Sequence, residues 1–292
     1  MDPCTYQKFD RAYQDSVQQV LGYWTREMQV ELAAHCYGWH PDRFDFCRYL
    51  QASSPRYYRA YSSLCELTEG RSICDVGGFW GVLPLTFQRL GCEVTMTESL
   101  KFYSDSFHKL FNFVRTKGVT IVDMDPFEPI TSPVGTFDLV TVMAVLEHYP
   151  HSPKPLLDNV VAMLKRNGAI YLEVPNIAYW PKRMALLRGQ TPLVPIQDIV
   201  SSSIPFIGHH HEYTIAELRT LVGHLDLRIV KEEFYNYSQA GSVIRQFFRH
   251  PLQTFAFWAW PDTRECLAVA CTLRSNENVH GDHLGGHLDV PE

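Results

Sequence analysis

The chain has 292 residues, of which 46% are hydrophobic and 20% are charged, a composition typical of a globular protein with a substantial core. Its formal net charge is −6 and it has no long basic run, which argues against a broad nucleic-acid-binding surface. The polar N-terminus has no signal core, and no stretch approaches the roughly 20 apolar residues of a membrane span. We therefore expect no nucleic-acid partner and no transmembrane span.

The eight cysteines are scattered, and no CxxC pair occurs among them. A disulfide framework or a structural zinc site would usually show tighter spacing. Several of the cysteines lie inside apolar runs, where cysteine behaves as a small hydrophobic residue. We expect reduced thiols and a cytoplasmic location.

The first part of the chain, residues 1–70, is expected to form a helical extension. Apolar side chains recur there at the spacing of one helix face, for example at Val17, Val20 and Trp24. Proline suits the first turn of a helix, so we interpret Pro41 and Pro55 as helix starts.

From residue 71 the pattern changes to short apolar strands that alternate with helices. Strands are expected over residues 72–76, 93–97, 119–122, 137–143, 169–174, 227–234 and 266–273. Helices are expected after Gly81, over residues 154–165 with Gly168 as the terminator, and over residues 214–225. This alternation predicts an α/β fold: a Rossmann-like, seven-stranded, mostly parallel sheet with helices on both faces.

Two irregular segments, residues 177–213 and 235–265, interrupt the second half of the chain. They contain prolines and many aromatic residues, and we expect them to be cap insertions over a substrate site. The sheet domain would then run over residues 71–274, and the polar tail 275–292 is expected to be disordered.

The strongest motif is a glycine-rich turn directly after the first strand, in Ser72-Ile-Cys-Asp-Val-Gly-Gly-Phe-Trp-Gly81. Glycines allow a ligand to approach the backbone closely, and the amides at a helix start suit an anionic group such as a carboxylate. Asp75, Gly77, Gly78 and Gly81 are therefore candidate ligand-binding residues.

Two acidic residues support a nucleoside ligand at this sheet edge. Glu98 closes the second strand, where a carboxylate can accept both ribose hydroxyls, and Asp125 follows the third strand, where it could accept from an adenine amino group. Taken alone, Asp75 could merely brace the turn and Glu98 could be a solvated acid.

In these features the chain resembles the class I S-adenosylmethionine (SAM) dependent methyltransferases, in particular a subgroup found in polysaccharide and natural-product clusters. The likeness extends over Asp75, Gly77, Gly81, Glu98, Asp125, Phe137-Asp-Leu-Val140, Val145-Leu-Glu-His148, Leu172-Glu-Val-Pro-Asn176 and His209-His-His-Glu-Tyr-Thr214. The resemblance implies SAM as the cofactor and methyl transfer as the activity. One departure stands out, since Phe79 occupies the place of the usual middle glycine, so the turn could use Gly78 instead.

Two histidines are candidate catalytic residues for transfer to a hydroxyl group, because a hydroxyl acceptor must lose its proton. His148 lies just past the fourth strand and ranks first as the base, with helix capping as its structural alternative. His209 matches the recurring family histidine and ranks as a substrate-side residue. Metal binding by the run His209–His211 with Glu212 is an open alternative, but the expectation is that no metal is needed.

The acceptor pocket is expected to be built by the N-terminal helices and the two irregular segments. Candidate substrate residues, beside the histidines, are Glu147, Asn176, Tyr179, Trp180, Arg183 and His211. The aromatic cluster of residues 247–260 is interpreted as a lid or a core under the sheet, with a dimer face or a membrane-facing patch as the alternatives.

The predicted function is methyl transfer from SAM to a hydroxyl group of a small molecule or a glycan. Transfer to nitrogen, a catalytically silent SAM-fold binding protein and a nicotinamide-dependent oxidoreductase are the alternatives. The oxidoreductase is disfavoured because no spaced GxGxxG occurs. A homodimer is left open.

Overall fold

A computed structural model describes residues 5–124, 135–238 and 248–274. A single seven-stranded sheet has the strand order β3-β2-β1-β4-β5-β7-β6, in which all neighbours are parallel except the pairs that β7 makes with β5 and β6. The strands are β1 (Ser72–Val76), β2 (Glu93–Glu98), β3 (Val119–Asp123), β4 (Phe137–Met143), β5 (Leu164–Pro175), β6 (Leu227–Tyr235) and β7 (Cys266–Leu273). The predicted fold class is confirmed.

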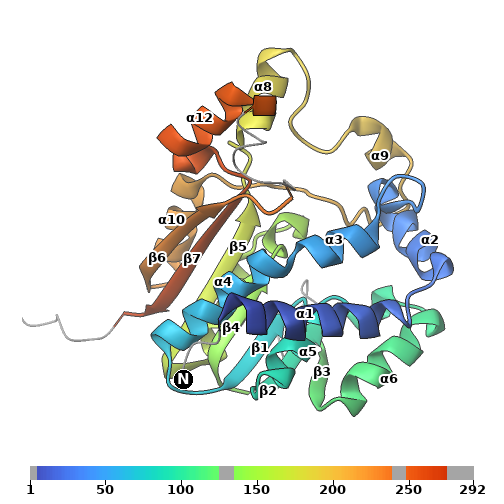
Figure 1. Ribbon diagram of the computed structural model, residues 1–292, viewed down its shortest axis with the longest axis vertical. Coiled ribbons are helices and arrows are strands. Elements are labelled where there is room, and N and C mark those ends of the chain that lie inside the picture. The colour runs from blue at the N-terminus through green and yellow to red at the C-terminus, as the bar shows by residue number, and fades with distance from the viewer. Residues whose placement is uncertain (1–4, 125–134, 239–247, 275–292) are drawn as a thin grey trace, which may run out of the picture.

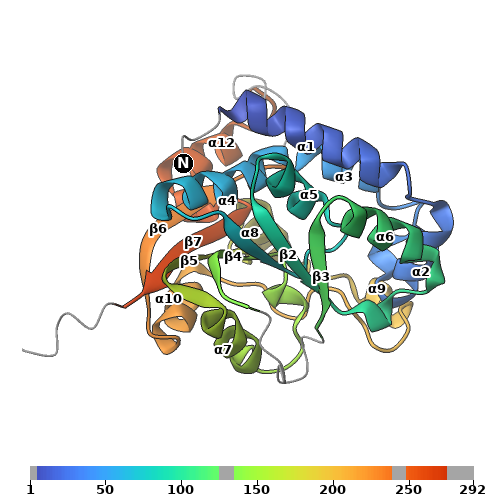
Figure 2. The same cartoon turned by 90° about the horizontal axis from the view of Figure 1, so that it is seen from below.

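Helices cover both faces of the sheet (Figures 1 and 2). One face packs against α1 (Tyr6–Leu21), α4 (Ser54–Leu67), α5 (Val82–Arg89) and α6 (His108–Thr116), and the other against α7 (Lys154–Ala162) and α10 (Ile215–His224). Alternate residues of a strand enter opposite cores: Ile73 joins the first, Cys74 the second. This is the pattern of a sheet buried on both sides.

The N-terminal helices belong to the same core as the sheet. The α1 side chains Phe9, Tyr13 and Val17 are fully buried and share one cluster with Ile73 and Leu85. Two further helices, α2 (Arg26–His35) and α3 (Phe46–Ala52), lie above the carboxyl edge of the strands (Figure 1). The extension therefore builds one wall of the space above that edge.

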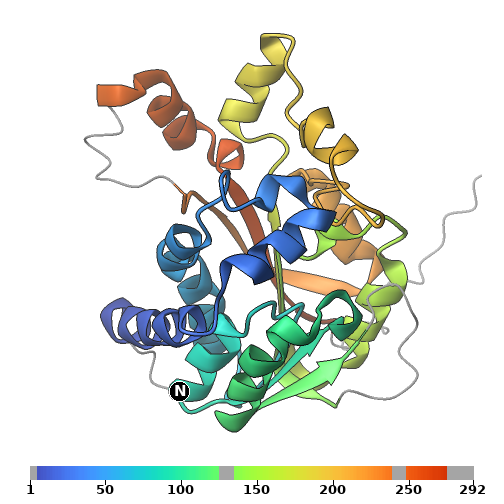
Figure 3. The same cartoon turned by 90° about the vertical axis from the view of Figure 1, so that its right-hand side faces the viewer.

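The second half of the chain adds α8 (Trp180–Leu187), α9 (Ile196–Val200) and α12 (Pro251–Ala259). All three lie at the carboxyl end of the parallel strands, the upper end in Figures 1 and 3. The cap segments thus contain short helices in addition to irregular chain. Hydrogen bonds from Ser203 N to Ala34 O (2.6 Å) and from Ile207 N to His35 O (2.9 Å) tie the chain after α9 to α2.

Three local predictions differ from the structure. The helix expected over residues 154–165 ends at Ala162, and β5 already begins at Leu164. Gly168 is not a helix terminator: it lies inside β5, and a Cβ there would come within 2.8 Å of the Phe137 carbonyl oxygen, so glycine permits the close approach of β4. Pro55 starts α4 as predicted, but Pro41 lies in a turn outside any helix.

Candidate functional site

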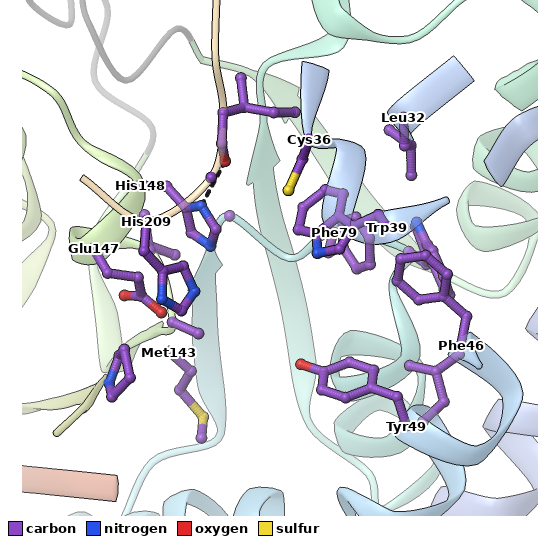
Figure 4. A pocket seen from close by; sticks show the side chains of 18 of the residues that line it. Leu32, Cys36, Trp39, Phe46, Tyr49, Phe79, Met143, Glu147, His148 and His209 are labelled. Carbon is purple, nitrogen blue, oxygen red and sulfur yellow. Dashed lines mark hydrogen bonds between the residues drawn. The ribbon is translucent and has the colours of Figure 1, made fainter. Parts of the chain in front are cut away.

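A cavity of about 920 Å³ lies at the carboxyl edge of the sheet, where the strand order reverses between β1 and β4. This is the switch point at which ligands bind in open α/β sheets. Figure 4 shows two facing walls: Glu147, His148 and His209 on one side, Trp39 and Phe79 among the aromatic rings on the other.

The glycine turn after β1 forms the floor of the cavity. Gly77 and Gly81 have φ angles of 68° and 75°, in the left-handed region that favours glycine. A Cβ at Gly77 would lie 2.7 Å from a methyl group of Val145. Gly77 and Gly78 line the cavity, whereas Gly81 lies behind it, where a Cβ would meet Val114 at 3.0 Å. Gly81 therefore serves the packing of α5 and α6, and not direct contact with a ligand.

Phe79 has a φ of 52°, in the left-handed region that favours glycine. Its N–H donates to Glu98 Oε2 at 2.8 Å, and its ring stacks on Trp80 with the centroids 4.3 Å apart. These contacts stabilise a left-handed backbone conformation, which is about 1–2 kcal/mol less favourable for a residue with a Cβ than the right-handed one. The turn thus keeps a left-handed residue at position 79 and adds an aromatic ring to the cavity wall.

The backbone amides of the turn are already bonded within the chain. Gly77 N and Gly78 N donate to Thr97 O at 3.0 and 3.1 Å, and Gly81 N donates to Gly78 O at 2.9 Å. Phe79 N donates to Glu98, so these four amides are hydrogen-bonded to other groups of the chain. The predicted carboxylate contact at the turn therefore needs other donors.

Asp75, at the end of β1, is a buried cavity residue whose Oδ1 accepts a hydrogen bond from Thr141 Oγ1 at 2.6 Å. Burial raises the pKa of Asp75 to about 7, although the hydrogen bond from Thr141 acts in the opposite direction. The carboxyl group is therefore poised between its two protonation states near neutral pH.

Glu98, at the end of β2, lines the same cavity. Burial raises the pKa of Glu98 to about 7, against the hydrogen bond from Phe79 N and a further one from Tyr103. The structure thus brings Asp75 and Glu98 to one cavity with the glycine turn, as the sequence predicts. Asp125, the predicted adenine-side acid, lies outside the described residues.

His148 and His209 come together from distant parts of the chain, with ring centroids 4.9 Å apart. His148 follows β4 in a short 3-10 helix (Leu146–His148), and its Nδ1 lies 2.7 Å from Ile207 O. Burial, together with the neighbouring His209, lowers the pKa of His148 to about 3. His148 is therefore neutral at physiological pH but is a weak base.

His209 is oriented by a carboxylate. Its Nδ1 lies 2.8 Å from Glu212 Oε1, and the other oxygen of Glu212 forms an ion pair with Lys182. Burial alone would raise the pKa of Glu212, but the hydrogen bond from His209 and the charge of Lys182 bring it below its ordinary value. An ionised Glu212 that accepts from Nδ1 leaves the His209 Nε2 lone pair free.

Glu147 adds a buried carboxyl group to this wall. One of its oxygens has no hydrogen-bond partner within the described part of the chain, and burial raises the pKa of Glu147 to about 7. One atom from each of Glu147, His148 and His209 lies within 4.8 Å of the others, a spacing that metal ligands could adopt after a small contraction. The metal alternative thus involves these three residues and not the run His209–His211.

The other predicted substrate residues do not line the cavity. Asn176 is buried, and its side-chain amide donates hydrogen bonds to the backbone carbonyl oxygens of Asp262 and Arg264. His211 Nε2 lies 3.4 Å from Glu217 Oε1. Beyond β5, Tyr179 stacks on Phe257, Trp180 begins α8 and Arg183 pairs with Asp262 at 3.5 Å. Of the six residues Glu147, Asn176, Tyr179, Trp180, Arg183 and His211, Glu147 alone is part of the described cavity wall.

Several cavity residues were not identified from the sequence, although the N-terminal region that contains them was expected to help build the pocket. Trp39, Phe46 and Tyr49 supply aromatic surface, and Arg56 reaches the cavity from α4. Arg56 is buried and forms an ion pair with Glu173 on β5 at 2.5 Å. The aromatic-rich stretch 37–58 was the one available signal, but helical spacing alone does not distinguish a cavity wall from a core.

The aromatic cluster before β7 is not a core. Phe255, Trp258 and Trp260 are exposed, and Phe257 alone of its described rings is buried. The exposed rings therefore do not belong to a core under the sheet, whereas a lid stays a prediction; Phe247 lies outside the described residues. Among the helices that the structure describes, none has the length and hydrophobicity of a membrane-spanning segment. The cysteines of the described residues are all free thiols.

Comparison with solved structures supports the fold. An O-methyltransferase family protein from Burkholderia thailandensis is 12% identical with a TM-score of 0.51, covering 93% of this chain and 71% of that one. A magnesium protoporphyrin IX methyltransferase from Synechocystis PCC 6803 with bound S-adenosylhomocysteine (SAH) is 13% identical, with a TM-score of 0.48 and coverage of 84% and 98%. An N-methyltransferase from Bradyrhizobium japonicum WM9 in complex with SAH is also 13% identical, with a TM-score of 0.46 and coverage of 77% and 88%.

A search of curated proteins finds no match. A family described as "Methyltransferase domain" matches residues 22–232, which is most of the chain. This match confirms the resemblance drawn from the motifs and removes the nicotinamide-dependent oxidoreductase as an alternative. The chain belongs to the methyltransferase-domain family.

Proposed function

We propose that this protein transfers the methyl group of SAM to a hydroxyl group of a small molecule or a glycan. The observation that carries the proposal is that one cavity joins the glycine turn and Glu98 to two imidazoles whose orientation is fixed. The turn and acids would hold the nucleoside and amino-acid parts of SAM, and the imidazoles would face the acceptor.

The proposed cofactor residues are Asp75, Gly77, Gly78 and Glu98, with Gly81 supporting the turn from behind and Asp125 added from sequence alone. SAM supplies an electrophilic methyl group on a sulfonium that leaves as neutral SAH. The cavity must therefore bring the acceptor oxygen in line with the methyl–sulfur bond and exclude water.

We propose His209 and not His148, the first choice from the sequence, as the base, because Glu212 orients His209 whereas burial lowers the pKa of His148. In the proposed step the acceptor oxygen bonds to the methyl carbon, the carbon–sulfur bond breaks, and the hydroxyl proton passes to His209 Nε2. The Glu212 carboxylate stabilises the resulting imidazolium. His148, a weaker base, would accept a hydrogen bond that orients the acceptor.

A metal-assisted reaction is the second candidate, favoured by the grouping of Glu147, His148 and His209. A divalent cation there would lower the pKa of a bound hydroxyl without a protein base. The base mechanism predicts that dialysis against EDTA leaves turnover unchanged. Loss of turnover that Zn²⁺ or Mn²⁺ restores would instead make the three residues metal ligands.

Two experiments test the proposal. SAH should raise the melting temperature, because a ligand that binds only the native state adds about 2.7 kcal/mol at 100 times its dissociation constant, whereas NAD should not. Transfer of a carbon-13 labelled methyl group from SAM to a panel of alcohols, glycosides and amines should give O-methyl products, identified by the chemical shift of the label. N-methyl products alone would establish the nitrogen alternative. SAH binding without turnover on any acceptor would favour the silent binding protein.

The remaining expectations belong to the same proposal. We place the enzyme in the cytoplasm and expect no nucleic-acid partner, in line with the net charge of −6. A homodimer stays open, and sedimentation of the purified chain decides it.

A further inference from the structure

We propose that α8 and α12 form a docking face for an anionic lipid membrane, and that the acceptor is the polar headgroup of an amphiphile held there. The second half of this proposal rests on the proposed function, whereas the first half does not. The face, called the apolar face below, consists of Leu186, Leu187, Leu252, Phe255, Trp258 and Trp260, all of them exposed.

The exposure of these side chains is unusual for their size. Leu187 is 79% exposed and Trp258 is 77% exposed, and α8 buries none of its side chains. Phe255 lies 6.0 Å from both Trp258 and Trp260, measured between ring centroids, so these exposed rings are grouped. Single exposed apolar residues are ordinary, but a group of large ones marks an interaction surface. Leucine and tryptophan together are typical of helices that lie in the interface of a bilayer.

The two helices are held together in a way that leaves this face outward. Tyr179, just before α8, stacks on Phe257 of α12 with the ring centroids 5.8 Å apart and the planes 3° from parallel. Arg183 of α8 pairs with Asp262 just after α12. Both helices lie at the carboxyl end of the parallel strands, the upper end in Figures 1 and 3.

The charge around the face suits an anionic surface. The chain as a whole has a net charge of −6, but residues 177–207 and 248–260 are basic. Their lysines and arginines are Lys182, Arg183, Arg188 and Arg249. Lys182 and Arg183 are already paired with Glu212 and Asp262, whereas Arg188 and Arg249 are exposed and would face the anionic headgroups. Asp198 is the one acidic residue in these two segments, and it is buried and paired with Arg43. Basic side chains beside an apolar face attract anionic headgroups, and this attraction adds to the insertion of the apolar side chains into the bilayer.

The chain that continues from α8 links the apolar face to the cavity. Val194, Pro195 and Asp198 belong to the cavity wall. In the same stretch, Ile196 is exposed and Ile204 is 96% exposed. A headgroup could therefore enter the cavity while its lipid chains remain in the bilayer.

A second copy of this chain is a less suitable occupant. In a two-fold dimer the same surface meets itself, so a dimer through this face would bring two copies of Arg188 and Arg249 together. Like charges at an interface are unfavourable, whereas anionic headgroups would neutralise them.

The experiment is co-sedimentation of the full chain with vesicles of phosphatidylcholine alone and of phosphatidylcholine with phosphatidylglycerol. We expect binding to the anionic vesicles, and a loss of at least about tenfold in the double variant Leu187→Asp/Trp258→Asp, since each change removes a large inserted side chain. Val30→Asp is the matched control, because Val30 is an exposed apolar residue of α2, outside the face. SAH-induced stabilisation of each variant verifies folding without involving lipid.

The outcomes separate the two proposals. Anionic-vesicle binding that the double variant loses and the control keeps supports the docking face, even if no methyl transfer is found. Absence of vesicle binding, or equal binding by wild type and double variant, overturns it and leaves methyl transfer to soluble acceptors untouched. A dimer that the double variant dissociates, without vesicle binding, overturns it in favour of a dimer face.

Discussion

Nδ1 of His209 lies 2.8 Å from a carboxylate oxygen of Glu212, three residues further along the chain. The same carboxylate is anchored by Lys182, and the backbone N–H of His210 donates to Glu147 O at 2.6 Å. The imidazole therefore faces the cavity in a fixed orientation with its Nε2 lone pair available. This relationship is the reason for assigning the base role to His209 and not to His148.

Replacing His209 by alanine should lower kcat by about 10²–10⁴-fold, the usual contribution of a positioned base, while SAH affinity stays unchanged. Glu212→Gln should lower kcat in the same direction, because the amide no longer stabilises the imidazolium. The exposed His224 at the end of α10 provides the control His224→Ala. If His148→Ala abolishes turnover and His209→Ala does not, the assignment is reversed.

Two substitutions at Phe79 measure the strain of the turn. Both Phe79→Gly and Phe79→Ala remove the ring from Trp80, but alanine keeps a Cβ at φ 52°. The free energy of unfolding should therefore be about 1 kcal/mol higher for the glycine variant, although glycine is more flexible when unfolded. Urea denaturation decides the order, and a more stable alanine variant would contradict the inferred strain.

The raised pKa of Asp75 predicts a pH-dependent stability. A carboxyl group with a pKa of 3.8 when unfolded and about 7 when folded keeps its proton longer in the native state. The native state then binds more protons, so this group's contribution falls as pH rises from about 4 through about 7. The lowered pKa of His148 has the opposite effect: its contribution to the free energy of unfolding rises with pH over part of this range.

Comparison of wild type with Asp75→Asn isolates the Asp75 contribution, because His148 is common to both. The variant should gain stability relative to wild type as pH rises, by up to about 4 kcal/mol in total, since one pKa unit corresponds to about 1.4 kcal/mol. Urea denaturation without ligand across this pH range measures the difference. A difference that does not vary with pH would show that Asp75 titrates normally.

The buried ion pair between Arg56 and Glu173 should tie α4 to β5 at the edge of the cavity. Their side chains are 3% and 1% exposed, so either charge left alone would be strongly unfavourable. Arg56→Leu and Glu173→Leu should each cost about 3–5 kcal/mol of unfolding free energy, and the double variant should cost less than their sum. Additive losses would show that the two charges do not interact.

The sheet could be predicted from the sequence because its strands are short apolar runs separated by glycines. Strands β1, β4 and β7 have the predicted bounds, since a strand buried on both faces is recognisable without knowledge of its neighbours. The start of β5 could not be predicted, because Gly168 has the same local appearance whether it ends a helix or lets β4 approach.

The part of the candidate site that lies at the strand ends could be predicted from the sequence. The part that depends on tertiary contacts could not. Topology alone brings Asp75 and Glu98 together at the edge of the sheet. The pairing of His209 with Glu212, and the carbonyl of Ile207 that holds His148, require the fold of the cap segment. The proposal of His209 as the base rests on these tertiary contacts, whereas the sequence alone ranked His148 first.

Calorimetric titration of the full chain with SAH measures whether the cavity at the junction of β1 and β4 binds SAM. We expect one site per chain and an affinity at least about tenfold weaker for Glu98→Gln, which loses a charged acceptor for the ribose hydroxyls. His224→Ala should bind SAH as wild type does. Absence of SAH binding by the wild type, or equal affinity in Glu98→Gln, would refute SAM binding at this site.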